Sequence, residues 1–273
     1  MKTSIFNSIW LRAKNFRMTR KVFSYPYILF LLFFVVIPAA LILVYAFLDS
    51  SNNLTFGNFI SIFTDGASLK VLLTSLLVGV VTTVLCFILG YPVAYILSRK
   101  KSGKFMVLLF VLPMWVNFLI RTLATKAIFV ALDVELGMGT VIFGMVYNYL
   151  PFMILPLHTI LTSIDTSYEE AAKDLGADRI TVFIKTTLPL SIPGILSGIT
   201  MVFIPTISTF AISQLLSDYT IFLFGDSIHT KFNNNLYGVG SVMSLIMLIF
   251  VVLSNIVISK VSGKQQQGGS NLW

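Results

Sequence analysis

The sequence predicts an all-α, polytopic membrane protein with six transmembrane helices. Of its 273 residues, 56% are hydrophobic and only 11% are charged, whereas a soluble domain carries about 25% charged residues. The mean hydropathy is +0.90. Six uncharged runs provide the ~20 residues that a helix needs to cross about 30 Å of hydrocarbon, without the period-two alternation of a membrane β-barrel. A soluble enzyme, a disordered chain and a disulfide scaffold are therefore excluded.

The six runs define the expected spans. Five of them are long enough on their own, whereas the third reaches the required length only by continuing past Arg121. Because a charge at mid-membrane costs about 2.5–3.5 kcal/mol, we expect Arg121 at or near a membrane boundary. The runs cover residues 28–48, 71–98, 105–120 with a continuation past Arg121, 136–164, 186–217 and 236–259.

The distribution of Lys and Arg predicts the orientation of the spans. Fifteen of these residues lie on the side of the N-terminus and four on the other side. The positive-inside rule places the fifteen in the cytoplasm, and six spans keep both termini there. The chain then divides into a basic cytoplasmic segment (1–24), a transmembrane domain (25–262) with a protruding loop (165–187), and a disordered cytoplasmic tail (263–273). The basic segment is either an amphipathic helix on the anionic membrane surface or a tail that only fixes orientation.

The loop at residues 165–187 has more structure than a simple connector. Five acidic and three basic residues between 165 and 185 keep it out of lipid. Ser167 and Glu170 fit a capping box that starts a short helix, Gly176 is placed to end it, and Asp178 can cap a second one. The loop is either a knob that meets a cytosolic partner or an ordinary capped surface helix. Its apolar residues recur at spacings of three and four, typical of one helical face: Ile164, Tyr168, Ala171, Ala172 and Leu175.

A motif within this loop resembles the EAA loop of ABC importer permeases. The motif consists of Glu-Ala-Ala at 170–172, Gly176 after three residues, and Leu-Pro at 188–189. Thr186 stands where that family usually has isoleucine, and Ile184 is a nearby apolar substitute. The loop also precedes the fifth of six spans, as in that family. The resemblance implies the MetI-like fold of type I importer permeases and a contact with a cytosolic ATPase through Glu170, Ala171, Ala172, Gly176, Leu188 and Pro189.

The same resemblance implies a set of partners and a place in the cell. These are a homologous second permease subunit that completes a heterodimer, two ATPase subunits that carry ATP and Mg, and an extracytoplasmic solute-binding protein, all at a bacterial inner membrane. This chain has no Gly-rich phosphate loop followed by Lys and Ser or Thr, so we expect neither ATP hydrolysis nor a cofactor on it. The spacing of its two histidines and one cysteine predicts no metal site, and its basic residues border apolar runs, which argues against a nucleic-acid partner.

A second stretch, residues 112–124, resembles the Pro-x-Trp-x-Asn-x-Leu-Ile-Arg-Thr segment of the first permease subunit of spermidine/putrescine importers. This resemblance implies a polyamine substrate, although permeases for iron or another small solute carry similar segments. Pro113 favours a kink, and Asn117 and Arg121, four residues apart, would share one helical face. That face either lines a solute path, or Arg121 reaches the outer headgroups while Asn117 makes a packing hydrogen bond.

The expected spans contain no acidic residue, so a cationic solute would meet only aromatic faces and dipoles. The same feature argues against an ion-coupled secondary carrier, which needs intramembrane charge. A membrane enzyme is also disfavoured, because Asp165, Glu169 and Glu170 have no nearby His or Cys in the sequence. Gly194 and Gly198 predict close helix packing. Eight residues are candidates for lining the pathway, although a packing role could also explain each of them. They are Trp115, Asn117, Tyr147, Asn148, Tyr149, Phe203, Thr206 and Asp218.

Overall fold

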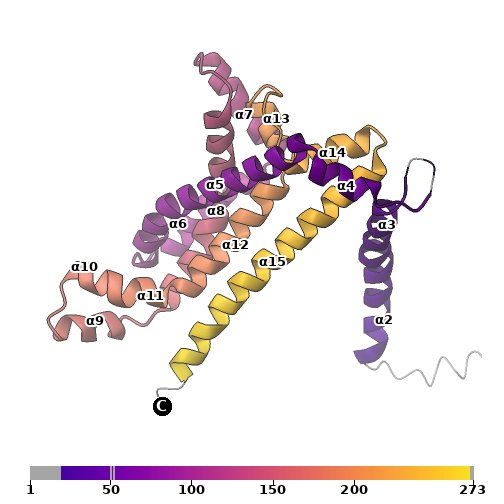
Figure 1. The fold of residues 1–273 in the computed structure, drawn as a ribbon. Helices are drawn as coiled ribbons and strands as arrows, with labels where there is room; N and C mark the ends of the chain where they lie inside the picture. The colour runs from indigo at the N-terminus through magenta and orange to yellow at the C-terminus, as the bar shows by residue number, and fades with distance from the viewer. Residues whose placement is uncertain (1–19, 50, 52, 271–273) are drawn as a thin grey trace, which may run out of the picture.

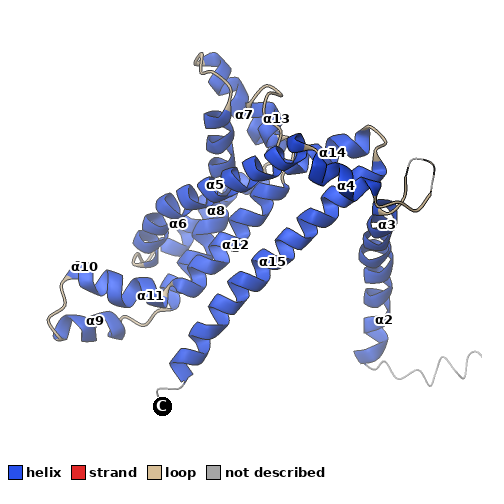
Figure 2. Ribbon diagram, viewed as in Figure 1, coloured by secondary structure: helices blue, strands red, loops and turns tan. Residues whose placement is uncertain are grey.

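The computed structural model describes residues 20–49, 51 and 53–270, and the predicted basic segment at 1–24 lies mostly outside these residues. The described part of the chain consists of helices joined by loops and turns, and its β structure is one isolated antiparallel bridge between Leu48 and Leu54 (Figure 2). The all-α prediction is therefore confirmed.

Three long helices form the centre of the fold (Figure 1). They are α5 (Gly66–Ser98), α8 (Met138–Ser163) and α12 (Ile192–Ser208), and each packs against the other two. Lipid is as apolar as a leucine side chain, so close van der Waals contact has to hold such helices together. A Cβ on Gly194 would lie 2.9 Å from the Cβ of Ile160, and one on Gly198 would lie 2.5 Å from the Met153 sulfur. The predicted close packing at these two glycines is confirmed.

Four single helices match predicted spans, and two predicted spans are bent. The first, second, fourth and sixth runs correspond to Ser24–Ala46, Gly66–Ser98, Met138–Ser163 and Tyr237–Lys260. The third and fifth runs correspond to helix pairs that bend by 89° and 63°. Six spans result if each bent pair counts as one.

The third span breaks sharply after residue 115. It consists of α6 (Gly103–Val111), the 3-10 helix η2 (Leu112–Trp115) and α7 (Phe118–Ala131). Asn117 is the N-cap of α7, and its side chain accepts a hydrogen bond from the backbone N–H of Leu119 at 2.8 Å. The kink expected near Pro113 is therefore a complete break. Asn117 and Arg121 were predicted to share one helical face, but Asn117 precedes the first helical residue of α7 with non-helical backbone angles, and its side chain turns back to the backbone of Leu119.

The fifth span is shorter than predicted at its far end. It runs through α10 (Arg179–Val182), the π-helix η3 (Phe183–Thr187), α11 (Leu188–Leu190) and α12, which ends at Ser208. The chain then turns into the short helix α13 (Ile212–Leu216) instead of continuing to residue 217.

A buried carboxylate explains the early end of the fifth span. Asp226, in α14 (Phe224–Asn233), is completely buried. Its oxygens accept hydrogen bonds from the backbone N–H groups of Ala211 at 2.9 Å and Leu223 at 2.8 Å, and from the Ser213 hydroxyl. A buried carboxylate needs such donors, and a straight continuation of α12 would commit the N–H group of Ala211 to a hydrogen bond within the helix instead of to Asp226.

The first span stands apart from the central helices (Figure 1). It comprises α2 (Arg20–Leu31), the π-helix η1 (Leu32–Val36) and α3 (Ile37–Ala46), and it is unburied over its apolar window. Its main tertiary contact is between α3 and α15 (Tyr237–Ser270). A cluster of Ala46, Ile62, Phe224, Val242 and Met243 joins this end of the span to α14, α15 and α4 (Gly57–Thr64).

The C-terminal helix continues further than predicted. The backbone is helical to Ser270, whereas the sequence predicts a disordered tail from residue 263. Lys and Gln are good helix formers, and extending an existing helix costs much less than starting one. Residues 271–273 lie outside the described part.

Replacing Gly194 by alanine tests the α8–α12 contact. The new methyl group would lie 2.9 Å from the Cβ of Ile160 and 3.1 Å from the Pro156 carbonyl oxygen. We expect a loss of about 1–3 kcal/mol in stability, measured by thermal unfolding in detergent. The control is Gly66→Ala, because a Cβ there meets nothing within 4 Å. Equal melting temperatures for the two variants would contradict the close approach.

Candidate functional site

The segment with the resemblance to an EAA loop protrudes from one end of the central helices (Figure 1). It carries α9 (Ser167–Asp174), which turns back toward α10. The predicted capping box of Ser167 and Glu170 is wrong, because Ser167 is already the first helical residue. Asp165 performs this function instead, since its side chain accepts a hydrogen bond from the backbone N–H of Ser167 at 2.9 Å.

The end of α9 forms as predicted at Gly176. This residue has φ +85°, a conformation that glycine adopts without steric cost. The N–H of Gly176 donates to the Lys173 carbonyl at 2.8 Å, and that of Ala177 donates to the Ala172 carbonyl at 3.1 Å. This pair of hydrogen bonds is a Schellman motif, which satisfies the last carbonyls of the helix. Asp178 then caps α10 as predicted, accepting from the N–H of Thr181 at 3.2 Å.

Most of α9 is exposed and points away from the rest of the chain. We use the name coupling face for four exposed residues of α9 and its C-cap, namely Tyr168, Glu170, Ala171 and Leu175, of which Leu175 is 89% exposed. The predicted apolar stripe therefore faces outward, and only Ile164 and Ala172 are half-buried. An apolar face with one carboxylate, displayed on a short capped helix, has the chemistry of a docking surface.

The remaining motif residues lie behind this face. Leu188 is half-buried and packs against the core cluster of α5, α8 and α12. Pro189 is exposed at the start of α11. Of the six predicted contact residues, the exposed ones are therefore Glu170, Ala171, Gly176 and Pro189.

The sequence reasoning missed Glu169, which faces inward. Glu169 is only 8% exposed and forms an ion pair with Arg99, and the Thr187 hydroxyl donates to the same carboxylate oxygen at 2.8 Å. Adjacent residues on a helix differ in direction by about 100°. The motif residue Glu170 was expected to face a partner. The helical period therefore indicated that the preceding residue, Glu169, points in a different direction.

The candidate pathway residues on α8 differ in burial. Tyr147 is exposed, and its ring lies 5.8 Å from the guanidinium of Arg121, a cation–π distance. Asn148 is buried, with its amide donating to the Gly144 carbonyl at 2.8 Å. Its other side-chain atom, Oδ1, has no hydrogen-bond partner among the described residues. Tyr149 is half-buried between two core clusters.

The other candidates are dispersed. Trp115 is 81% exposed beside the break in the third span, and Asn117 caps α7. Thr206 is buried and donates to the Val202 carbonyl at 2.6 Å. Phe203 lines an apolar groove of about 460 Å³ between α5, α12 and α15, whereas Tyr147 lines a different groove of about 510 Å³ beside α7. These candidates therefore do not lie together in one pocket within this chain.

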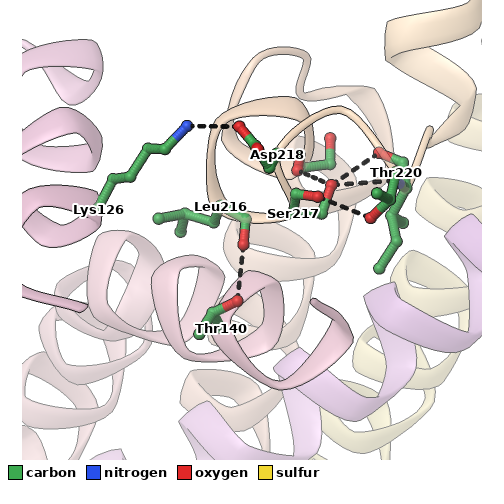
Figure 3. A network of polar contacts seen from close by, with 8 residues as sticks. Lys126, Thr140, Leu216, Ser217, Asp218 and Thr220 are labelled. Atoms are coloured by element: carbon green, nitrogen blue, oxygen red, sulfur yellow. Dashed lines mark hydrogen bonds and ion pairs between the residues drawn. The ribbon is translucent and has the colours of Figure 1, made fainter. Parts of the chain in front are cut away.

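Asp218 belongs to a polar network (Figure 3) that follows α13, at the end of the central helices opposite α9 (Figure 1). Its carboxylate binds the Lys126 ammonium at 3.0 Å, which links the α13 segment to α7. The Thr140 hydroxyl, on α8, donates to the Leu216 carbonyl at 2.7 Å. The Asp218 side chain is exposed and already paired, so any further cation that it contacts must share its carboxylate with Lys126.

Comparison with known proteins places this geometry among transport proteins. The family model described as "Binding-protein-dependent transport system inner membrane component" matches residues 5–264. The chain is 34% identical to the spermidine/putrescine transport system permease protein PotB of Haemophilus influenzae, over 81% of this chain and 88% of that protein. It is 33% identical to PotB of Salmonella typhimurium, over 72% and 79%.

The fold has a solved counterpart. The crystal structure of a bacterial alginate ABC transporter, in complex with an alginate pentasaccharide-bound periplasmic protein, contains a chain that superposes with a TM-score of 0.66 at 13% identity. The match covers 89% of this chain and 94% of that one. At this identity the likeness concerns the fold alone, and it supports the type I importer permease architecture.

Substitutions at Gly176 test the Schellman motif. A β-branched residue in the left-handed conformation costs about 1–2 kcal/mol, whereas asparagine adopts it more readily. Gly176→Val should therefore lower the hydrogen-exchange protection of α9 about five- to thirty-fold, and Gly176→Asn much less. Because a side chain at 176 would meet nothing within 4 Å, equal effects of the two substitutions would show that conformation is not the cause.

The caps of the two short helices predict a pH dependence. Hydrogen bonds from the Thr181 hydroxyl and backbone lower the pKa of Asp178 below its ordinary value of 3.8, and those from Ser167 do the same for the pKa of Asp165. Their stabilising contribution is therefore complete above pH 3.8 and is lost as the pH falls through the lowered pKa. Hydrogen exchange of residues 176–185, corrected for the intrinsic rate, should show fraying below that pH. Asp178→Asn should remove the pH dependence at α10, and an unchanged profile would contradict it.

Proposed function

The chain belongs to the family of binding-protein-dependent transport system inner membrane components, and on this premise we propose that it is one permease subunit of an ATP-driven polyamine importer. It forms half of the transmembrane pathway for spermidine and putrescine. The identity to two spermidine/putrescine permeases over most of the chain supports this substrate class. The single observation that carries the coupling role is the outward-facing apolar surface of α9 beside Glu170.

We propose that the coupling face sits in a cleft of a cytosolic ATPase subunit. Ala171 allows close approach of the helix, Leu175 supplies an apolar anchor, and Glu170 pairs with a basic group of the ATPase. ATP and Mg belong to that subunit, and the coupling face performs no bond-breaking chemistry.

The proposed assembly contains a homologous second permease subunit, two ATPase subunits and an extracytoplasmic solute-binding protein. The unburied first span offers a large apolar surface for the second permease subunit. The excess of Lys and Arg on the side of α9 supports an orientation with both termini in the cytoplasm.

The polyamine would pass through weak contacts. The buried Asp226 and the exposed Asp218, both opposite α9, already have partners, since Asp226 accepts three hydrogen bonds and Asp218 pairs with Lys126. Neither can hold a polycation as tightly as a free acid. A site that binds weakly suits a pathway that must release its solute after each conformational change. An exposed aromatic face such as that of Trp115 remains available to cations.

In the proposed cycle, this chain converts movement of the ATPase into movement of its spans. ATP binding brings the two ATPase subunits together and draws the coupling helices toward each other. The spans then change from inward-facing to outward-facing, and hydrolysis returns them. The solute-binding protein delivers the polyamine to the outward-facing state.

Reversing the charge at Glu170 tests the docking. In proteoliposomes with the ATPase, second permease subunit and binding protein, Glu170→Arg should lower ATPase co-purification and spermidine-stimulated ATP hydrolysis at least about ten-fold, because like charges would meet in the cleft. The control is Glu135→Arg, the same change at an exposed outer-loop residue. Full activity of Glu170→Arg would contradict docking through this face.

Competition for uptake tests the substrate class. Unlabelled spermidine and putrescine should each reduce uptake of labelled spermidine by the same proteoliposomes, and ferric iron should not. Absence of labelled spermidine uptake, together with ATP-dependent uptake of labelled ferric iron by the same proteoliposomes, would assign the permease to a different solute.

A further inference from the structure

We propose that Glu169, held by Arg99 and Thr187, is a positioning residue that joins the coupling helix α9 rigidly to α5 and to the start of the fifth span. The ion pair and hydrogen bond make these three segments move as one body when α9 is displaced. This inference rests on the proposed docking of α9 and identifies how displacement of that helix reaches the membrane.

The three residues come from segments far apart in the sequence. Arg99 is the C-cap of α5, Glu169 lies in the first turn of α9, and Thr187 is the last residue of η3. The carboxylate oxygen Oε1 of Glu169 accepts from both the Arg99 guanidinium and the Thr187 hydroxyl. Thr187 is completely buried, and the Glu169 side chain is 10% exposed. One carboxylate therefore connects three elements at a single point.

The burial of α9 shows why this point matters. The helix has eight residues, too few to be stable in isolation, and Glu169 is its one buried residue. The apolar side chains of the coupling face point away from the bundle and cannot fix α9 against it. Besides its contacts with α10 and η3, α9 is therefore held on this chain mainly by the side chain of Glu169.

A second layer of contacts extends the connection toward the core. The Arg99 guanidinium lies 5.3 Å from the Tyr95 ring. The Phe183 ring packs edge-on between Tyr91 and Tyr95, at 5.7 and 5.6 Å. The Tyr91 hydroxyl and the Ser191 hydroxyl are 2.9 Å apart and buried. The cytosolic part of α5 and the segment from η3 to α12 are therefore joined by aromatic packing and hydrogen bonds.

The adjacent acids 169 and 170 then have opposite tasks. Glu170 faces outward to the ATPase, and Glu169 faces inward to this chain. Without the carboxylate charge, Arg99 loses its ion-pair partner, and α9 keeps its coupling face but loses its fixed direction. Such a helix still docks, but its displacement is taken up by rotation of the loop instead of reaching α5.

Uptake per ATP hydrolysed is the deciding measurement, because a merely structural residue would change yield without changing this ratio. In the reconstituted complex, Glu169→Gln should retain ATPase co-purification within about two-fold, while spermidine uptake per ATP falls about ten-fold. Thr187→Val, which keeps the shape, should give a smaller fall. The double variant Glu169→Arg with Arg99→Glu should recover much of the loss. The control Lys100→Gln removes an exposed neighbouring charge and should match the unmodified protein.

A distance measurement on the permease alone separates this proposal from the docking. Spin labels on Lys173→Cys and Lys101→Cys, both exposed, should give a narrow distance distribution that Glu169→Gln broadens. An unchanged distribution together with an unchanged uptake-to-hydrolysis ratio overturns the positioning role and leaves the docking intact. Loss of the ATPase from Glu169→Gln, as in Glu170→Arg, also overturns it by making Glu169 a docking residue. If the unmodified protein binds no ATPase, the proposed function fails.

Discussion

Every backbone N–H and C=O group of this chain that lies in hydrocarbon must be paired within the protein, and the rest of the structure depends on this constraint. The constraint favours helices, because a helix pairs its backbone groups internally. Wherever a helix is interrupted, other groups must replace the hydrogen bonds that are lost. The interruption at 116–117 is met by the Asn117 side chain, which restarts α7. The interruption after Ser208 is met by the carboxylate of Asp226. Polar side chains therefore stand where the spans break, and they fix the angle at which each following helix leaves.

Side chains also replace missing backbone hydrogen bonds at the opposite end of the central helices, where water is accessible. There the chain leaves the membrane for two short helices that are capped by Asp165 and Asp178 and closed by Gly176. These local devices define the shape of the protruding segment, and Glu169 ties it to the bundle. Two consecutive glutamates can point one to solvent and one to their own chain because the helix turns by about 100° per residue.

Local chemistry was predictable from the sequence, whereas tertiary partners were not. Apolar run length located four single spans, glycine and aspartate located the turn after α9, and Gly194 and Gly198 indicated the close approach of α12 to α8. The end of α12 at Ser208 was not predictable, because it depends on Asp226, whose burial depends on donors 13 to 15 residues away. Glu169 was missed for the same reason, since its partners lie 70 and 18 residues away. The pathway remains the least predictable part, because aromatic residues that line a path and those that only pack have the same sequence pattern.

The separation of the first span has a consequence for how the protein is made. This span is synthesised before the other spans described above, yet its main contact among the described residues is with α15, which is synthesised after all of them. Throughout translation the early helix therefore waits in the bilayer without its intramolecular neighbour. During that time, the hydrophobicity of the helix and its flanking charges must hold it in the membrane. Errors during biogenesis should therefore concentrate at this helix. Quality-control proteases that recognise unassembled membrane segments would act on the newly made chain there first.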